Sequence, residues 1–314
     1  MKTRDDKAVK FDFITDFTAP EIRRRLLSLS DQTKSKAFEI RIKTGAPIML
    51  STNQGCMPLG AYAFDPSQTP YTVTKEDMDT TFEFVTGASI HAVLEELKYG
   101  FVTISGGHRV GVCGKAVMER GEILSIRDIS SLNFRIAHEI VGCADKVIGR
   151  IIDGGIRSTL VISPPSCGKT TLLRDIARQL SNGVPHLHFS GVKVGVIDER
   201  SEICGMYRGK PQNDIGVRTD VLDLCPKSLG IGLMLRSMSP DVIITDELLY
   251  KEDVRAVMQA HNTGVSVIAS VHGKDAEEIR KKRLFYELFG EGVFSLAITL
   301  SNTPKIGTPS VCRL

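Results

Sequence analysis

The stretch Thr159-Leu-Val-Ile-Ser-Pro-Pro-Ser-Cys-Gly-Lys-Thr-Thr-Leu-Leu-Arg-Asp-Ile-Ala-Arg178 joins an apolar run, a loop and an amphipathic run. The β-branched run at 159–162 predicts a strand, and the apolar spacing within 170–180 predicts a helix. Gly168-Lys169-Thr170 lies between them, which is typical of a phosphate-binding loop. Backbone N–H groups and the positive end of the helix would both face a bound phosphate. The segment therefore predicts a nucleotide-binding α/β fold.

Seven consecutive residues are the candidates for holding the nucleotide: Pro165, Ser166, Cys167, Gly168, Lys169, Thr170 and Thr171. The amides of 166–171 can donate to phosphate oxygens, and Lys169 would reach the β and γ phosphates. The hydroxyl of Thr170 would bind Mg²⁺, so the expected cofactors are ATP and Mg²⁺. Ser163 stands where the pattern usually has its first Gly, and it can serve if that position needs no positive φ.

A second candidate site is the acidic end of the run Val242-Ile-Ile-Thr-Asp246-Glu247. In phosphate-loop enzymes one acid at such a strand end holds Mg²⁺, directly or through water. The next acid can position or deprotonate the attacking water. We therefore expect Asp246 to be a metal ligand and Glu247 to be catalytic.

Two more apolar runs end in residues that suit the same chemistry. Asp198-Glu199-Arg200-Ser201-Glu202 follows one run, and Ser270-Val271-His272 ends another. Glu199 or Glu202 is a second candidate to activate water, although a surface pairing with Arg200 is an open alternative. His272 could contact the γ-phosphate, whereas a histidine at a strand end, taken alone, is more often structural.

The order of strand and helix signals predicts an α/β protein with a mostly parallel sheet covered by helices. Strands are expected at 159–162, 194–197, 242–245 and 265–270, and helices at 170–180, near 228–238 and at 252–261. In the first half, helices are expected at 20–29, from Thr74 with Asp77 completing its cap, and at 89–97, with strands at 37–43, 101–105 and 110–113. A helix is also expected at 137–152. We place a smaller amino-terminal α/β domain at 1–140 and the nucleotide-binding domain at 141–314.

Composition excludes several classes of protein. The 314 residues are 42% hydrophobic and 25% charged, which rules out disorder or a fibrous fold as the main state. Forty basic and 37 acidic residues nearly balance, so nucleic acid is not an expected partner. The seven cysteines form no CxxC pair and their number is odd, which favours a reducing compartment. With no apolar stretch of bilayer length and no signal-peptide core, we expect folding in the cytosol.

Taken together, six segments resemble the stage III sporulation protein AA family, a group related to the secretion and pilus motor ATPases. The segments are Phe38-Glu-Ile-Arg-Ile-Lys43, Gly100-Phe-Val-Thr-Ile-Ser-Gly-Gly-His-Arg-Val-Gly111, Ile129-Ser-Ser-Leu-Asn-Phe-Arg-Ile-Ala137, Pro164-Pro-Ser-Cys-Gly-Lys-Thr-Thr-Leu-Leu-Arg-Asp175, Asp198-Glu-Arg-Ser-Glu-Ile203 and Arg236-Ser-Met-Ser-Pro-Asp-Val-Ile-Ile-Thr-Asp-Glu247. The resemblance covers nearly the whole chain.

The resemblance implies a RecA-like ATPase domain behind a smaller α/β domain. It implies a hexameric ring that holds ATP between subunits. It also implies a peripheral motor on the mother-cell side of the forespore membrane, at a channel between the two cells. The implied partner is the cytoplasmic part of stage III sporulation protein AB.

The family's functional residues map onto this sequence at matching positions. Lys169 matches the family's phosphate-binding lysine and Thr170 its Mg²⁺ ligand. Asp246 and Glu247 match the second acidic motif. The remaining matches are Asp198, Glu199 and Glu202 on the acidic box, His272 on the histidine box, Arg236 on an arginine before the acidic strand, and Arg218 as a weaker candidate for reaching a neighbour's phosphate. A departure follows Glu247, where Leu248-Leu249-Tyr250 replaces the usual Ile-Gly-Arg.

Three functions stay open on the sequence. The leading one is an ATP-hydrolysing motor at a membrane channel. The second is a nucleotide-gated scaffold with little turnover, motivated by Ser163, Leu249 and Tyr250. The third is a nucleic-acid-stimulated RecA-like motor, against which stand the balanced charge and the absence of Trp.

Overall fold

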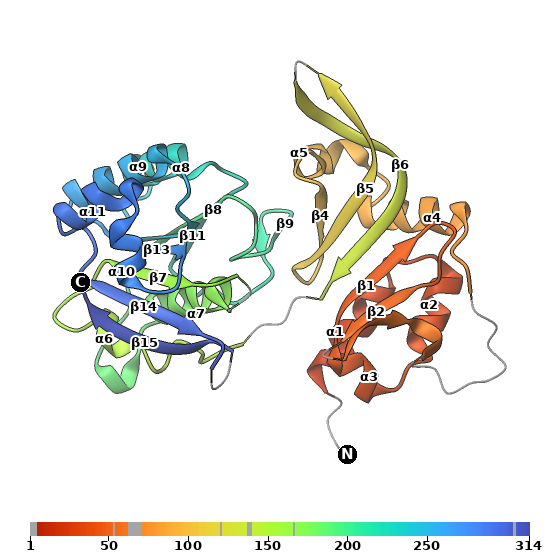
Figure 1. Ribbon diagram of the computed structural model, residues 1–314, viewed down its shortest axis with the longest axis horizontal. Coiled ribbons are helices and arrows are strands. Elements are labelled where there is room, and N and C mark those ends of the chain that lie inside the picture. Colours follow the sequence, from red (N-terminus) through yellow and green to blue (C-terminus); the bar gives the residue numbers. More distant parts are fainter. Residues whose placement is uncertain are drawn as a thin grey trace. The chain divides into compact units, whose positions relative to one another are not determined.

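The computed structural model describes residues 5–52, 54–61, 71–119, 121–136, 140–165, 167–303 and 306–314 (Figure 1). Contacts between residues divide the chain into two units, Met1–His138 and Glu139–Leu314. Each unit has its own sheet and its own buried apolar core. The described helices include none with the length and apolar character needed to cross a bilayer.

The amino-terminal unit is built on a six-stranded antiparallel sheet in the order β3-β2-β1-β6-β5-β4. Its strands are β1 (Ala37–Lys43), β2 (Met49–Thr52), β3 (Gly55–Pro58), β4 (Phe101–Ile104), β5 (His108–Glu119) and β6 (Glu122–Arg135). Its α-helices are α1 (Asp6–Thr15), α2 (Pro20–Leu27), α3 (Asp31–Lys36), α4 (Lys75–Thr86) and α5 (Leu94–Lys98). The outer parts of β5 and β6 form a two-stranded arm that extends beyond the rest of the sheet (Figure 1).

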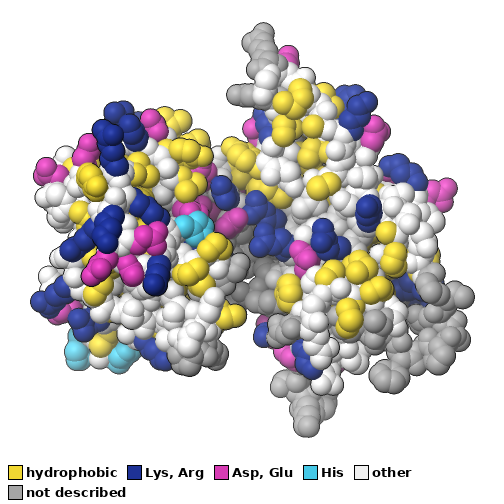
Figure 2. All heavy atoms as spheres, in the orientation of Figure 1, with side chains coloured by type: hydrophobic (Ala, Val, Ile, Leu, Met, Phe, Trp, Pro, Cys, Tyr) yellow, Lys and Arg dark blue, Asp and Glu magenta, His cyan; other side chains and the backbone are white. Residues whose placement is uncertain are grey.

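Alternation along β1 gives this sheet a buried and a solvent face. Ile40 and Ile42 are fully buried, whereas Arg41 and Lys43 between and after them are exposed. The pattern is the one expected for a half-buried strand, and the predicted range 37–43 is confirmed. Lys and Arg side chains are spread over the face of this unit that Figure 2 shows.

The predicted cap of α4 is confirmed. The Thr74 side chain accepts from the Asp77 N–H, and the Asp77 carboxylate accepts from the Thr74 N–H, so two donors at the helix start are satisfied. The predicted helix at 89–97 begins instead as a 3₁₀ segment, Ile90–Val93, before α5.

The helix predicted over 137–152 is wrong in extent. Within the described residues it is reduced to α6 (Ile148–Ile151), and 141–147 form turns. Gly142 adopts a φ of 84°, a left-handed conformation that interrupts a helix. Ala144, Val147 and Ile151 are nevertheless buried, so their apolar spacing serves a packed turn region instead of one long helix.

The carboxy-terminal unit is a seven-stranded, mostly parallel sheet in the order β11-β8-β12-β13-β7-β14-β15. The strands are β7 (Thr159–Ser163), β8 (Val194–Asp198), β11 (Thr219–Asp223), β12 (Val242–Glu247), β13 (Ser266–His272), β14 (Leu296–Ser301) and β15 (Thr308–Arg313). Among the described strands of this sheet, only β14 and β15 pair antiparallel. A separate short hairpin joins β9 (Met206–Tyr207) to β10 (Lys210–Pro211). The predicted parallel α/β sheet is confirmed.

Helices cover both faces of this sheet. They are α7 (Lys169–Asn182), α8 (Lys227–Ser237), α9 (Lys251–Asn262), α10 (Ala276–Lys281) and α11 (Tyr286–Gly290). Val161 packs with α6 and α7 in one buried cluster, whereas its neighbour Ile162 packs with α8 and α9 in the other. Because successive side chains of a strand point to opposite faces, the continuously buried strand at 159–163 needs this double cover.

Candidate functional site

The candidate site lies along the carboxyl edge of the parallel strands. Ser163, Asp198, Glu247 and His272 are the last residues of β7, β8, β12 and β13. His272 pairs with Ser163 in the register of the sheet, and Glu247 pairs with Ser270 two residues before His272. Parallel strands bring their carboxyl ends to one edge, which is where ligands of open α/β sheets bind.

The predicted phosphate loop connects β7 to α7. Gly168 is the residue before the helix and has a φ of 88°, while an added Cβ would meet no atom within 4 Å. Conformation, not space, therefore requires glycine there. Lys169, Thr170 and Thr171 form the first turn of α7, where backbone N–H groups have no partner within the helix. Ser166 lies outside the described residues.

The departure at Ser163 causes no backbone strain. Ser163 is fully buried, is not among the residues with positive φ, and donates its hydroxyl to the Pro164 carbonyl at 2.7 Å. Cys167 is also buried, and its Sγ lies 3.0 Å from Oδ1 of Asn302. Both side chains therefore fill and tie down the loop.

Lys169, His272 and Glu247 form a connected chain of contacts. Nζ of Lys169 lies 2.8 Å from Nδ1 of His272, and Nε2 of His272 lies 2.9 Å from Oε2 of Glu247. Because an ammonium can only donate, Nδ1 must accept, and Nε2 then carries the proton that it donates to Glu247. These two partners define a neutral His272 with the proton on Nε2.

The ammonium of Lys169 also points back at the end of β7. It lies 3.3 Å from the Ser163 carbonyl oxygen and 3.4 Å from that of Pro164. Burial lowers the pKa of Lys169, and the Glu247 carboxylate opposes part of that shift. In this arrangement Lys169 is held by neutral groups that a phosphate could replace.

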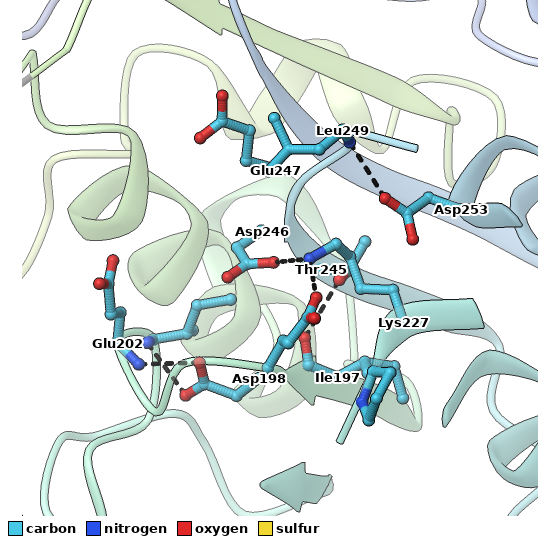
Figure 3. A network of polar contacts seen from close by, with 12 residues as sticks. Ile197, Asp198, Glu202, Lys227, Thr245, Asp246, Glu247, Leu249 and Asp253 are labelled. Carbon is cyan, nitrogen blue, oxygen red and sulfur yellow. Dashed lines mark hydrogen bonds and ion pairs between the residues drawn. The ribbon is translucent and has the colours of Figure 1, made fainter. Parts of the chain in front are cut away.

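A buried lysine that the sequence analysis missed lies in the acidic half of the site. Lys227 Nζ contacts Oε2 of Glu199 and lies 2.8 Å from Oδ1 of Asp246 (Figure 3). Its side chain is 5% exposed. Lys227 is the first residue of α8, where a cation opposes the helix dipole. The sequence signal that could have indicated acidic partners was a lysine at the start of a helix that follows β11.

Burial and pairing act against each other on these charges. Burial raises the pKa of Asp246 to about 6, although the Lys227 ammonium lowers it. Burial alone would lower the pKa of Lys227, but the carboxylates of Asp246 and Glu199 outweigh it and raise the pKa. At neutral pH both partners are therefore charged.

Asp198 shapes the acidic loop instead of facing a ligand. Its carboxylate accepts the backbone N–H groups of Glu202, Ile203 and Cys204 at 2.8, 3.0 and 2.8 Å. Burial raises the pKa of Asp198 to about 6, while the three N–H donors lower it. The Glu202 carboxylate extends away from Asp198 in Figure 3. The two candidate bases of this loop thus differ, because Glu199 is paired with Lys227 whereas Glu202 is bound through its backbone.

Helix α7 is tied to the same loop. The guanidinium of Arg174 donates to the backbone carbonyls of Ile203 and Glu202, the latter at 2.8 Å. The helix that begins at the phosphate loop therefore also fixes the position of the acidic loop.

The two predicted arginines do not join the site within one chain. Arg218 precedes β11, at the opposite edge of the sheet, and donates to the Ser181 carbonyl at 2.6 Å near the end of α7. Arg236 is exposed in the last turn of α8, the end remote from Lys227.

The residues that replace the usual Ile-Gly-Arg build the start of α9. Leu248 is buried, and the N–H of Leu249 donates to Oδ2 of Asp253 at 3.0 Å (Figure 3). The N–H of Tyr250 donates to the same oxygen at 3.0 Å. Asp253 thereby satisfies two donors at the helix start. The Tyr250 side chain remains exposed.

The donor set at this edge fits Mg²⁺ in its chemistry. Thr170 offers a hydroxyl and Asp246 a carboxylate, both hard oxygen ligands. Two oxygens are fewer than the roughly six that Mg²⁺ takes, and the ion usually completes its shell with water and substrate phosphates.

Structural comparison defines the class of protein first. The ATPase DotB of Legionella pneumophila superimposes with a TM-score of 0.57 at 17% identity, covering 93% of this chain and 79% of that one. The pilus retraction motor PilT, solved with bound ADP, gives a TM-score of 0.57 at 17% identity, covering 93% and 81%. The fold is therefore that of the RecA-like secretion and pilus ATPases.

Sequence comparison then gives the family. The chain belongs to the family "Sporulation stage III, protein AA", which matches residues 9–311. Stage III sporulation protein AA of Bacillus subtilis (strain 168) is 40% identical over 292 residues, which are 93% of this chain and 91% of that protein. The resemblance predicted from the sequence segments is thus confirmed.

Proposed function

We propose that this chain is an ATP-hydrolysing motor of a sporulation channel complex between mother cell and forespore. The observation that carries the proposal is the convergence of Lys169, His272 and Glu247 at the mouth of a phosphate loop. Sequence places these residues far apart, and their meeting at a ligand-binding sheet edge suits phosphoryl transfer to water. The bound ADP of PilT, which shares the fold, supports a nucleotide as the ligand.

In the proposed reaction each side chain has a distinct task. Lys169 exchanges its contact with His272 for the β and γ phosphates and stabilises their charge. Glu247 accepts a proton from the attacking water, with Glu199 and Glu202 as the other candidate bases. His272 holds Glu247 in place through Nε2, and it holds Lys169 until the phosphates replace that contact. Mg²⁺, held by Thr170 and Asp246, would neutralise phosphate charge.

The assembly is part of the same proposal. We expect a homo-oligomer, a hexameric ring with ATP between subunits, in which Arg236 or Arg218 of one subunit approaches the phosphates of the next. The domain at 141–314 would hydrolyse ATP and that at 1–140 would make assembly contacts. The ring would sit peripherally on the mother-cell side, on the cytoplasmic part of stage III sporulation protein AB.

A second candidate is a nucleotide-gated scaffold with little turnover. It is favoured by one observation: both Lys169 and Asp246 already have internal partners, His272 and Lys227. Nucleotide must displace these contacts, which would slow a motor but suits a switch.

The deciding experiment is ATP hydrolysis by the full chain across protein concentrations, with sizing of the same samples. Lys169→Ala is the test variant, and Lys274→Ala, at an exposed position of the same unit, is its control. Activity that rises with a larger species and disappears only in Lys169→Ala supports the ring ATPase. Nucleotide binding without turnover favours the scaffold. A chain that neither binds nor hydrolyses ATP would refute both proposals.

A further inference from the structure

Lys227 is placed at two energetic disadvantages, because it is buried and it lies at the positive end of α8. Its ammonium also occupies space between acids that the proposed function needs for a cation. Replacing a buried ion pair by apolar side chains is often neutral or stabilising, so folding alone does not require this charge. The position of Lys227 therefore points to a role in the site.

The geometry makes Lys227 and a divalent cation alternatives. The ammonium lies 2.8 Å from Oδ1 of Asp246 and also contacts Glu199. Mg²⁺ binds carboxylate oxygen at about 2.0–2.1 Å, so both cations on one carboxylate would repel each other at close range. A metal on Asp246 therefore favours a longer or broken bond from Asp246 to Lys227, while Glu199 can keep the ammonium.

We propose that Lys227 is a built-in counter-ion that competes with divalent metal for Asp246, so that metal enters only together with nucleotide phosphate. This rests on the proposed function, since it takes Asp246 as the acid that faces the nucleotide-bound ion. Without nucleotide, Lys227 neutralises Asp246 and Glu199. With nucleotide, phosphate oxygens add the ligands that shift Asp246 from the ammonium to the metal. Lys227 is thus a positioning residue and not a catalytic one.

The charges around Lys227 define what its removal does. Glu199 directly follows β8, Asp246 is the penultimate residue of β12, and the carboxylate of Asp198 adds to the negative charge near Asp246. Lys227→Met keeps most of the side-chain volume but leaves acids without a cation. Under the proposal, the carboxylates of Asp246 and Glu199 would then take a divalent ion in place of the ammonium.

The test is Mn²⁺ binding to the nucleotide-free full chain, followed by loss of the free Mn²⁺ signal in electron paramagnetic resonance. We expect wild type to bind Mn²⁺ weakly, with a Kd of about 1 mM or higher, and Lys227→Met to gain one site at least roughly tenfold tighter. Lys227→Arg, which keeps the charge, should behave as wild type, as should Lys274→Met at an exposed position. Lys227→Met/Asp246→Asn should lose the gained site.

Two results would overturn the proposal. One is tight Mn²⁺ binding by the nucleotide-free wild type. This measurement uses no variant, so it stays informative even if Lys227→Met misfolds. The other is a folded Lys227→Met, with wild-type circular dichroism, that gains no Mn²⁺ site, since a purely structural lysine would alter stability alone. A fluorescent ADP titration on the same samples keeps the hypotheses apart. Failure to bind ADP contradicts the proposed function, whereas the Mn²⁺ result alone judges Lys227.

Discussion

The carboxyl edge of the sheet holds two lysines, and their burial and their partners differ. On the β7–β13 side, Lys169 lies against the neutral ring of His272, which is 42% exposed. On the β8–β12 side, Lys227 is almost fully buried between two carboxylates. Burial lowers the pKa of Lys169, whereas the carboxylates raise that of Lys227. A lysine held by neutral groups is ready for a phosphate, while one held by acids stays until another cation replaces it.

The largest expected effect is on ATP hydrolysis, and it distinguishes Glu247, on the Lys169 side of the sheet edge, from Glu199, on the Lys227 side. Glu247→Gln should lower ATP hydrolysis by about 10²–10⁴-fold with ATP binding retained, because the amide cannot accept a proton from water. Single-turnover hydrolysis together with equilibrium ATP binding measures both parts. Glu252→Gln, at an exposed position in the first turn of α9, is the control. Wild-type hydrolysis in Glu247→Gln with loss in Glu199→Gln would move the base to the Lys227 side.

On the β8–β12 side of the sheet edge, the free energy of unfolding should depend on pH. The folded pKa of Asp198 is about 6 against an ordinary 3.8, so the folded state holds this proton more tightly than the unfolded chain. The contribution of Asp198 to the unfolding free energy therefore falls as pH rises from about 4 to 6, by up to about 3 kcal/mol.

Denaturant titrations at several pH values check this slope. Asp198→Asn should reduce this slope but not abolish it, because the pKa of Asp246 is also raised to about 6. The amide also loses backbone donors, which lowers stability at all pH values. Asp220→Asn, at an exposed position, should leave the slope as in wild type. An unchanged slope in Asp198→Asn would assign the pH dependence to other groups.

The His272 bridge can be probed by a matched pair. A glutamine amide can accept from Lys169 and donate to Glu247, as the imidazole does, whereas leucine can do neither. His272→Leu should lower hydrolysis roughly tenfold, the value of one hydrogen bond to a charged group, and His272→Gln should recover most of that loss. Equal activity of the two variants would show that the bridge does not position the site.

The smallest expected effect is on the free energy of unfolding, and it concerns a hydrogen bond between β12 and β8. Thr245 is fully buried in β12 and donates its hydroxyl to the Ile197 carbonyl of β8 at 3.1 Å. Thr245→Val keeps the shape but loses the donor, so the free energy of unfolding should fall by about 1 kcal/mol. Urea unfolding measures it, and ADP affinity should stay constant. A change in ADP affinity without a change in stability would contradict this structural role.

Local pattern predicted much of the fold and part of the site. The loop at 163–171 and the strands that end at Glu247 and His272 follow from apolar runs with polar ends, and the helices that flank them have the expected periodicity. The helix predicted at 137–152 failed because apolar spacing does not reveal the left-handed turn at Gly142. Lys227 was missed because its partners lie 28 and 19 residues away and no periodic rule connects them. The catalytic roles of Glu247, His272, Glu199, Glu202, Arg236 and Arg218 stay predictions.

The sequence by itself predicted the class of this protein, since a strand, a glycine-lysine-threonine turn and a helix in this order are typical of a phosphate loop, and its neighbouring motifs indicate the family. Only the tertiary structure decided which charges face each other. The register of parallel strands brings His272 between Lys169 and Glu247, and the start of α8 brings Lys227 between Glu199 and Asp246. The physical reason is that hydrogen bonds and ion pairs act over a few ångströms, a distance that chain order does not encode.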